Sequence, residues 1–226
     1  MAKEVAPEDT TRKAAYDLWM KAPNPMVTLI KTIDVTELVR YSRKNHMKFN
    51  MLMEYCIGRA ASEIKEFYIL PVGDKLIRYD RIAIDTIVRC RDGQIRYCDL
   101  DYCGDLYSFE IEYNKFIPET AEKCISRDLS EDRMVIGTSV IIDTVIDGAV
   151  GMYSGVFNNP FIIWGRYKRK RLRYYLSLSF QFHHTQMDGE EAGRFLELLQ
   201  REINSLKKSP GKQKANNRLP ENREEH

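Results

Sequence analysis

Two adjacent histidines followed by an aspartate and a glycine are the residues of this chain best suited to chemistry. They lie in the segment 183–189, HHTQMDG, and the chain of 226 residues has only four histidines. A neutral imidazole in an apolar pocket can take a proton from an alcohol, so His184 is a candidate general base. Asp188 lies beyond the predicted strand end, where its carboxylate can organise the loop. A surface histidine pair followed by an ordinary Asp-Gly turn explains the same residues about as well.

Histidines and a carboxylate are also zinc ligands, but their spacing opposes a zinc site. Neighbouring residues of a strand point to opposite faces, so His183 and His184 do not easily bind one ion. The cysteines form no C-x-x-C pair, and we expect no metal. Their odd number and a start without an apolar signal segment predict reduced thiols in a cytoplasmic protein. The five cysteines are Cys56, Cys90, Cys98, Cys103 and Cys124.

The elements that position the histidine pair can be predicted from hydrophobic periodicity. Residues 172–182 alternate between apolar and polar types, which predicts a strand with one buried face. If that strand continues, His184 joins its apolar face. Apolar residues at 192, 195, 196, 199 and 203 have helical spacing, so an amphipathic helix is expected to pack on the sheet.

The remainder of the chain shows both helical and strand patterns. Helices are predicted over 9–20, 35–41, 50–64 and 118–130, with Asp34 as a cap of the second. Strands are predicted over 26–34, 75–79, 82–90, 94–100, 106–113 and 134–142. Residues 1–206 are expected to form one domain. Residues 207–226 are rich in Lys, Asn, Arg and Glu and are expected to form a disordered basic and polar tail.

The composition limits the possible classes of function. The chain is 43% hydrophobic and 30% charged, which suits a globular protein with a full core. Its 35 basic and 33 acidic residues give a net charge of +2, too even a balance for a nucleic-acid binder unless the charge is locally gathered. No apolar run approaches the roughly 20 residues that cross a bilayer, so we expect a soluble protein without a membrane partner.

Several segments together resemble one family. The segment 183–189 resembles the H-H-x-x-x-D-G motif of the chloramphenicol acetyltransferase family, and 159–167, NPFIIWGRY, is similar to its A-P-x-x-T-M-G-K-Y strand. Residues 12–16, RKAAY, resemble its R-K-E-H-F, and 48–50, KFN, its K-F-Y. The resemblance spans roughly Arg12 to Leu206.

The resemblance implies a two-layer α/β sandwich, with helices on a mixed sheet, as in the CoA-dependent acyltransferase fold. It implies a homotrimer with each active site at a subunit interface. His184 would deprotonate the hydroxyl of chloramphenicol or a related acceptor, which attacks acetyl-CoA without an acetyl-enzyme, and antibiotic resistance would be the associated role. Asp188 would pair with Arg12. Arg166 and Tyr167 would lie near the coenzyme.

The chain also departs from the family pattern. Gly137 stands where the family has a serine that binds the oxyanion, so Thr138, Ser139, a backbone N–H or a water would have to replace it, and at most one of Thr138 and Ser139 can point into the site. Three positions of the acceptor pocket have unusual or ambiguous residues. Arg89 replaces an apolar phenylalanine and favours an anionic or strongly polar acceptor, or else faces solvent. The other two are Ile163, where the family has a threonine, and Trp19, an aromatic contact or simply core.

Six basic residues gather within 166–173, where a hairpin turn is expected. They form either a solvated loop or a contact for CoA phosphates. Two other functions stay open. The first is that the chain is a catalytically weak or inactive trimeric member of the family that binds a ligand. The second is that it is a basic-loop protein whose binding to nucleic acid depends strongly on salt. The six residues are Arg166, Lys168, Arg169, Lys170, Arg171 and Arg173.

Overall fold

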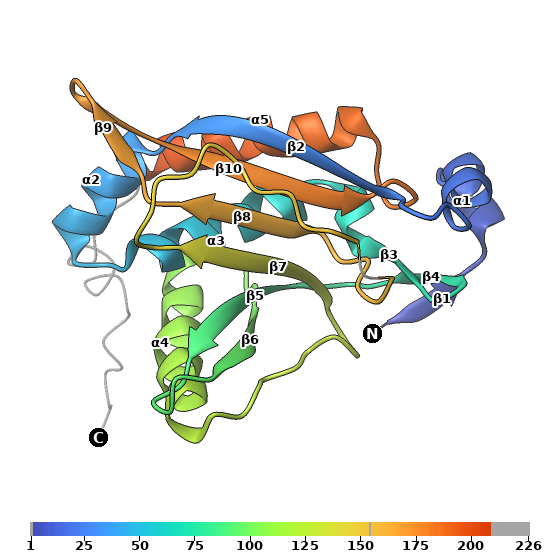
Figure 1. Ribbon diagram of the computed structural model, residues 1–226, viewed down its shortest axis with the longest axis horizontal. Coiled ribbons are helices and arrows are strands. Elements are labelled where there is room, and N and C mark those ends of the chain that lie inside the picture. Colours follow the sequence, from blue (N-terminus) through green and yellow to red (C-terminus); the bar gives the residue numbers. More distant parts are fainter. Residues whose placement is uncertain (1, 154, 209–226) are drawn as a thin grey trace, which may run out of the picture.

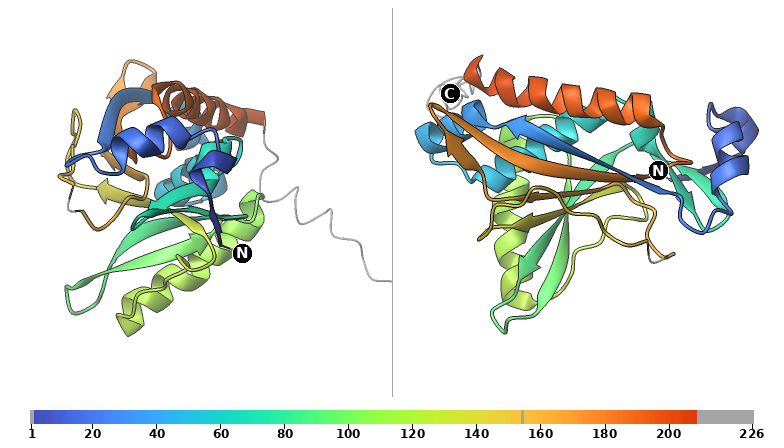
Figure 2. Two further views of the ribbon diagram at one scale, coloured as in Figure 1. Left: turned by 90° about the vertical axis from the view of Figure 1, so that its right-hand side faces the viewer. Right: turned by 45° about the horizontal axis from the view of Figure 1, so that its top comes forward.

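The computed structural model describes residues 2–153 and 155–208, and it contains one mixed sheet with helices on one face (Figures 1 and 2). The strand order is β2-β10-β8-β7-β5-β6, and β9 pairs with β10. A separate small sheet has the order β1-β4-β3. The large sheet consists of β2 (Met26–Asp34), β5 (Ile82–Arg89), β6 (Ile95–Asp101), β7 (Met134–Ile141), β8 (Phe161–Gly165), β9 (Lys168–Lys170) and β10 (Arg173–His183). The small sheet consists of β1 (Lys3–Val5), β3 (Ile69–Val72) and β4 (Lys75–Arg78).

The second layer consists of α2 (Thr36–Asn45), α3 (Phe49–Ser62), α4 (Leu106–Lys123) and α5 (Gly189–Ser205), with α5 running along the sheet beside α3. The first helix, α1 (Lys13–Trp19), lies beyond one end of the sheet. Short 3-10 turns lie at Pro7–Asp9, Lys65–Tyr68 and Leu206–Lys208. The predicted α/β sandwich is confirmed. Among the described helices, none is both long and apolar enough to cross a membrane.

The core lies between the helices and the face of β10 that the alternation predicts. Leu176, Leu178, Phe180 and Phe182 are all buried in it, and Phe180 packs against Phe195 of α5 with ring centroids 4.7 Å apart. Each such side chain contributes about 1.5–3 kcal/mol by leaving water. The predicted strand and the helix after it are therefore confirmed, because one face of each has a partner.

The opposite face of the sheet carries the residues between these core positions. In register across the strands, Gly137 lies beside Phe161, and Phe161 beside Gln181. The segment 142–153 crosses this face, where Ala149 N–H donates to Ser179 Oγ at 2.8 Å. Large apolar side chains remain exposed on the same face, among them Ile30, which is 52% exposed. We call this surface the open face.

The region 106–130 differs from its prediction. The strand predicted over 106–113 is wrong, since α4 occupies it, and the helix predicted over 118–130 ends at Lys123. Phe109 and Tyr113 are both buried on one side of α4, and a spacing of four suits a helix as well as a strand. Asp105 caps α4 by accepting from the Ser108 N–H at 2.9 Å. Cys124, with φ of 52°, ends the helix.

The first predicted helix is also shorter than expected, since a 3-10 turn precedes α1 and the helix begins at Lys13. The predicted tail lies outside the described residues from 209 onward. The division into one domain and a tail stays a prediction.

The prediction of reduced thiols is wrong for two of the five cysteines. Cys90 and Cys124 form a disulfide, with their Cα atoms 5.4 Å apart. The bond joins the end of β5 to the end of α4 across a separation of 34 residues, so local sequence gives no sign of it. Cys56, Cys98 and Cys103 are free thiols.

Reducing this disulfide is expected to lower the free energy of unfolding by about 3–4 kcal/mol, from the loop that it closes in the unfolded chain. Urea unfolding with and without a phosphine reductant measures the loss. The Cys103→Ser variant, which changes an exposed free thiol, should show the same loss on reduction. An unfolding curve insensitive to the reductant in both proteins would contradict the expectation.

One buried acid makes stability depend on pH. Glu54 of α3 is 1% exposed, its carboxylate oxygens have no hydrogen bond of good geometry, and burial raises its pKa to about 8. Between about pH 4.5 and pH 8, the folded state therefore keeps a proton that the unfolded state has already lost. Stability contributed by this group is greatest below that window and falls by up to about 1.4 kcal/mol per pH unit as the pH rises through it. Urea unfolding of Glu54→Gln at several pH values should show a shallower decline than the wild type; parallel curves would contradict this.

Candidate active site

His184 lies in the turn directly after β10, at the end of the sheet that faces α1. The strand stops at His183, and the His184 N–H donates to Pro25 O at 2.8 Å. Its side chain is 27% exposed. Trp19, the last residue of α1, stacks on the imidazole with ring centroids 4.4 Å apart and planes at 7°. An aromatic wall thus fixes the ring plane while the ring keeps access to solvent.

Arg12 holds the turn that carries His184. Its guanidinium donates to both Asp188 oxygens, at 2.7 and 2.9 Å. It also donates to the carbonyl of His184 at 2.8 Å and to the carbonyl of Thr185 at 2.9 Å. Arg12 is only 4% exposed. The structure therefore brings Arg12, Asp188 and His184 together in one clamp that fixes both the backbone and the carboxylate of the turn.

Asp188 contacts the imidazole as well as the guanidinium. Its Oδ1 lies 3.1 Å from His184 Nδ1. The hydrogen bond from Arg12 lowers the pKa of Asp188, so the carboxylate is charged. Asp188 also precedes α5, where its N–H donates to Glu191 Oε2 at 3.0 Å. The carboxylate therefore does more than organise the loop, because it borders one nitrogen of the ring.

His183 has a different environment from its neighbour. It is buried, and its Nδ1 accepts from the Thr185 N–H at 3.1 Å. Burial, with a smaller effect from His184, lowers the pKa of His183 to about 4. His183 is therefore a neutral hydrogen-bond acceptor that shapes the turn, and the two histidines have separate surroundings.

The two oxyanion candidates lie on opposite faces of β7. Thr138 is fully buried on the core face, and its hydroxyl donates to Asp85 O at 2.8 Å. Ser139 is half-buried on the open face, opposite Ile163 in register. Only Ser139 shares the face of Gly137. Thr138 therefore points into the core, and Ser139 stays the candidate on the side of Gly137.

Gly137 has no room for a side chain. A Cβ built there would lie 2.3 Å from Phe161 Cδ2. The Phe161 ring therefore fills the place next to Gly137, and sequence reasoning missed this residue because the parallel register of β7 and β8 cannot be read from either strand alone. Glycine and phenylalanine form a matched small and large pair.

Gly137→Ser is expected to cost about 1–3 kcal/mol of folding free energy, because the Phe161 ring must shift. Adding Phe161→Val should recover most of the loss, which urea unfolding of both variants can measure. Gly193→Ser in α5, where a Cβ meets nothing within 4 Å, is the matched control and should show no such loss. A Gly137→Ser protein as stable as the wild type would contradict the packing argument.

The residues assigned to the coenzyme lie at the other end of β10. Arg166 is exposed, and Tyr167 packs against Phe49 and Tyr174, with ring centroids 5.1 and 5.4 Å apart. The basic stretch forms the predicted hairpin, as β9 and the start of β10 (Figure 1). The eleven residues of β10 span about 34 Å. One chain therefore does not bring Arg166 and Tyr167 close to its own His184.

The three acceptor positions are also separated. Trp19 contacts His184, as described above. Ile163 is half-buried in the middle of the open face, and Arg89 is exposed at the end of β5, next to the disulfide. These three residues do not line one pocket within a single chain.

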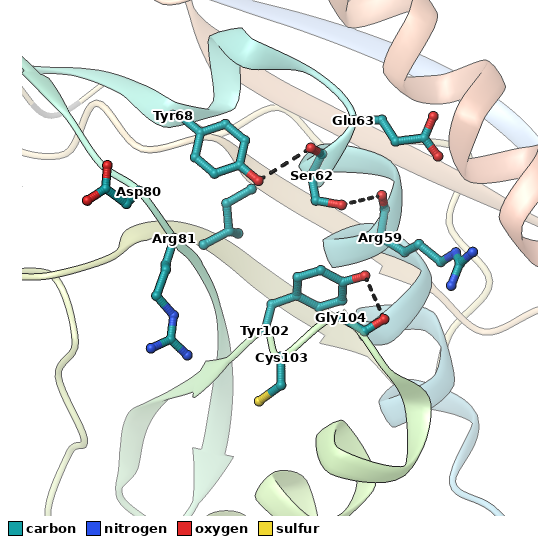
Figure 3. Close-up of a pocket in the computed structure, with 10 residues that line it drawn as sticks. Arg59, Ser62, Glu63, Tyr68, Asp80, Arg81, Tyr102, Cys103 and Gly104 are labelled. Atoms are coloured by element: carbon teal, nitrogen blue, oxygen red, sulfur yellow. Dashed lines mark hydrogen bonds between the residues drawn. The ribbon is translucent and has the colours of Figure 1, made fainter. Parts of the chain in front are cut away.

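A cavity of about 450 Å³ lies elsewhere, between the end of α3 and the loops that flank β5 and β6 (Figure 3). Its charged groups are paired with each other or with neighbours: Arg81 forms an ion pair with Asp101, and Arg59 contacts Glu202 at 2.6 Å. None of the site residues predicted from the sequence lines it. The lining residues are Arg59, Ser62, Glu63, Tyr68, Asp80, Arg81, Ile82, Tyr102, Cys103 and Gly104.

Comparisons with known proteins agree with this fold. A solved structure described as a chloramphenicol acetyltransferase superposes with a TM-score of 0.78 at 18% identity, over 90% of this chain and 100% of its own. A dihydrolipoamide acetyltransferase from Azotobacter vinelandii gives 0.66 at 17% identity, over 91% and 93%. The cubic core of a pyruvate dehydrogenase multienzyme complex gives 0.67 at 16% identity, over the same shares. A search of curated proteins found no match.

At these identities the solved structures establish the fold alone. The family is established by sequence, since the model of the family described as chloramphenicol acetyltransferase matches residues 4–200. The chain therefore belongs to the chloramphenicol acetyltransferase family, a family of acyltransferases.

Proposed function

We propose that this protein is an acetyl-CoA-dependent O-acetyltransferase in which His184 is the general base. The observation that carries the proposal is the arrangement around His184: Arg12 holds its carbonyl and Asp188, and Trp19 stacks on its ring. A base fixed in position and orientation, yet open to solvent, suits proton abstraction from a bound alcohol.

The reaction runs as a direct transfer. Asp188 borders Nδ1 of His184, so Nε2 is the atom that takes the proton from the acceptor hydroxyl. The hydroxyl oxygen forms a bond to the thioester carbonyl carbon, and the oxyanion of the tetrahedral intermediate needs a donor. Ser139 is our candidate donor. When the intermediate collapses, the C–S bond breaks and the sulfur of CoA takes the proton from the imidazolium, which leaves an acetyl ester and free CoA.

We further propose that the protein is a homotrimer whose sites are completed between copies. Arg166 and Tyr167, our candidate contacts for CoA, follow β8 and lie beside the first residues of β10, roughly 25–30 Å along that strand from His184 of the same chain. The open face supports the proposal because it exposes large apolar side chains that a second copy can cover. These side chains include Ile30, Ile87, Tyr97 and Ile141.

The proposed acceptor is chloramphenicol or a related hydroxylated small molecule. The proposed biological role is resistance to such a compound. The proposed location is the cytoplasm, where acetyl-CoA is available. The test is release of free thiol from acetyl-CoA in the presence of chloramphenicol and a panel of other alcohols. Release that requires both an acceptor and His184 supports the proposal. Absence of release with every acceptor counts against it.

A second candidate function is a catalytically weak or inactive member of the family that binds a ligand. The specific observation in its favour is the Phe161 ring against Gly137, where the family has its oxyanion serine. Binding of chloramphenicol or CoA in calorimetry without any thiol release would favour this second candidate over the first.

A further inference from the structure

Two cysteines and an aspartate converge at the turn between β5 and β6. Cys90 follows the last residue of β5, Asp92 lies in the turn, and Cys124 ends α4. One ligand atom from each residue lies within 4.8 Å of the other two. The proposed acyl transfer uses none of the three, and they lie apart from the clamp around His184.

The backbone holds these residues in place independently of the bond between the sulfurs. The Cys90 N–H donates to Gln94 O at 2.8 Å, and the Gln94 N–H donates to Asp92 Oδ1 at 2.9 Å, which fixes the turn. On the other side, Arg96 Nε donates to the carbonyl of Cys124 at 2.9 Å. The three side chains would therefore stay close after reduction of the disulfide.

Reduction changes the chemistry of this cluster. A dithiol gives two electrons and two protons to the disulfide, becomes a disulfide itself, and leaves Cys90 and Cys124 as thiols. Zn²⁺ then displaces the two thiol protons, so that two thiolates and the Asp92 carboxylate surround the ion. These are ligands that zinc prefers, and water can take the fourth tetrahedral position.

The charges nearby suit such a complex. Two thiolates, one carboxylate and Zn²⁺ sum to a charge of −1. The guanidinium of Arg96, hydrogen-bonded to the Cys124 carbonyl, carries the compensating positive charge. Arg91 lies next to Cys90 but is partly neutralised by Glu122 at 3.6 Å.

We propose that Cys90, Asp92 and Cys124 form a zinc site in the reduced protein. The ion then replaces the disulfide as the link between α4 and the end of β5, so that these elements stay joined under both oxidising and reducing conditions. This inference goes beyond the proposed acetyltransferase function and does not depend on it.

The test is zinc binding by the full-length protein in its two redox states. The protein is reduced with a phosphine, desalted without oxygen, and titrated with ZnCl₂ in competition with a chromophoric chelator. We expect one Zn²⁺ per chain in the reduced protein and none in the oxidised protein. Equal zinc binding by both forms would overturn the proposal, as would no binding by the reduced form.

Variants identify the ligands. Cys90→Ser and Cys124→Ser should each lower the zinc affinity by about 100-fold, and Asp92→Asn by about tenfold. Cys103→Ser changes an exposed free thiol outside the cluster and should bind as the wild type does. Substitution with Co²⁺ gives a second readout, since thiolate ligands produce charge-transfer absorption. Wild-type affinity in Asp92→Asn, or unchanged Co²⁺ absorption in either serine variant, would overturn the assignment.

Discussion

Replacing His184 with alanine is expected to lower kcat for acetyl transfer by a factor of about 10²–10⁴, the range of a lost general base. The loss should fall on kcat, because the imidazole acts on the proton that moves in the transition state and contributes little to ground-state binding. Folding should change little, since the ring is partly exposed and its main partner is the half-buried ring of Trp19.

The measurement is steady-state release of CoA thiol with whichever acceptor proves active. His46→Ala provides a matched control, because His46 is exposed at the end of α2, away from the turn, and should keep wild-type turnover. The His183→Asn variant distinguishes the two neighbours, since we expect it to affect stability more than the chemical step. Wild-type turnover in His184→Ala would remove His184 as the base and with it the proposed mechanism.

The elements next to His184 were predictable because their sequence pattern is local and unambiguous. β10 alternates over eleven residues with a well-packed core on one face, and α5 repeats its apolar residues at helical spacing. In α4 the same reasoning failed. Phe109 and Tyr113 suit either periodicity, and the predicted helix began at Pro118, although Pro118 lies inside α4.

The geometry of the site could not be derived from local pattern. Arg12 and Asp188 are 176 residues apart in the sequence, and only the resemblance to the family suggested their pairing. No pattern indicated that Phe161 fills the space beside Gly137, or that Cys90 meets Cys124. Each of these contacts joins residues of different elements, and the hydrophobic pattern of a single element does not specify how the elements are arranged.

The position of Arg89 shows the limit of carrying a role over from a family. The resemblance to the family suggested a place in the acceptor pocket, yet Arg89 is exposed at the end of β5, on the far side of β7 from Ile163. A positive charge there is no ground for an anionic acceptor within one chain. The sequence shows that residue 89 is an arginine, but it does not show which residues surround the side chain and so what its charge can bind.

Replacing Arg12 with alanine is expected to lower the free energy of unfolding by about 2–4 kcal/mol and kcat by at least about tenfold. The guanidinium is buried, and its loss leaves the carbonyls of His184 and Thr185 without their donors. We place the expected loss below the full range for a broken buried ion pair because the Asp188 side chain is 47% exposed and can regain water. The loss in kcat follows because the turn that positions the base is released.

Urea unfolding and steady-state kinetics of the same protein measure the two effects. Arg12→Lys keeps the positive charge but lacks the planar guanidinium with its parallel N–H donors. It should therefore recover part of the lost free energy of unfolding and a smaller part of the lost kcat. Arg173→Ala breaks another arginine–aspartate pair of similar length, 2.8 Å to Asp34, in which the arginine is exposed, and should cost less than about 1 kcal/mol. If Arg12→Ala were as stable and as active as Arg173→Ala, the Arg12–Asp188 pair would contribute no more than an exposed surface ion pair. The position of His184 would then have to be fixed by Trp19 and by the end of β10.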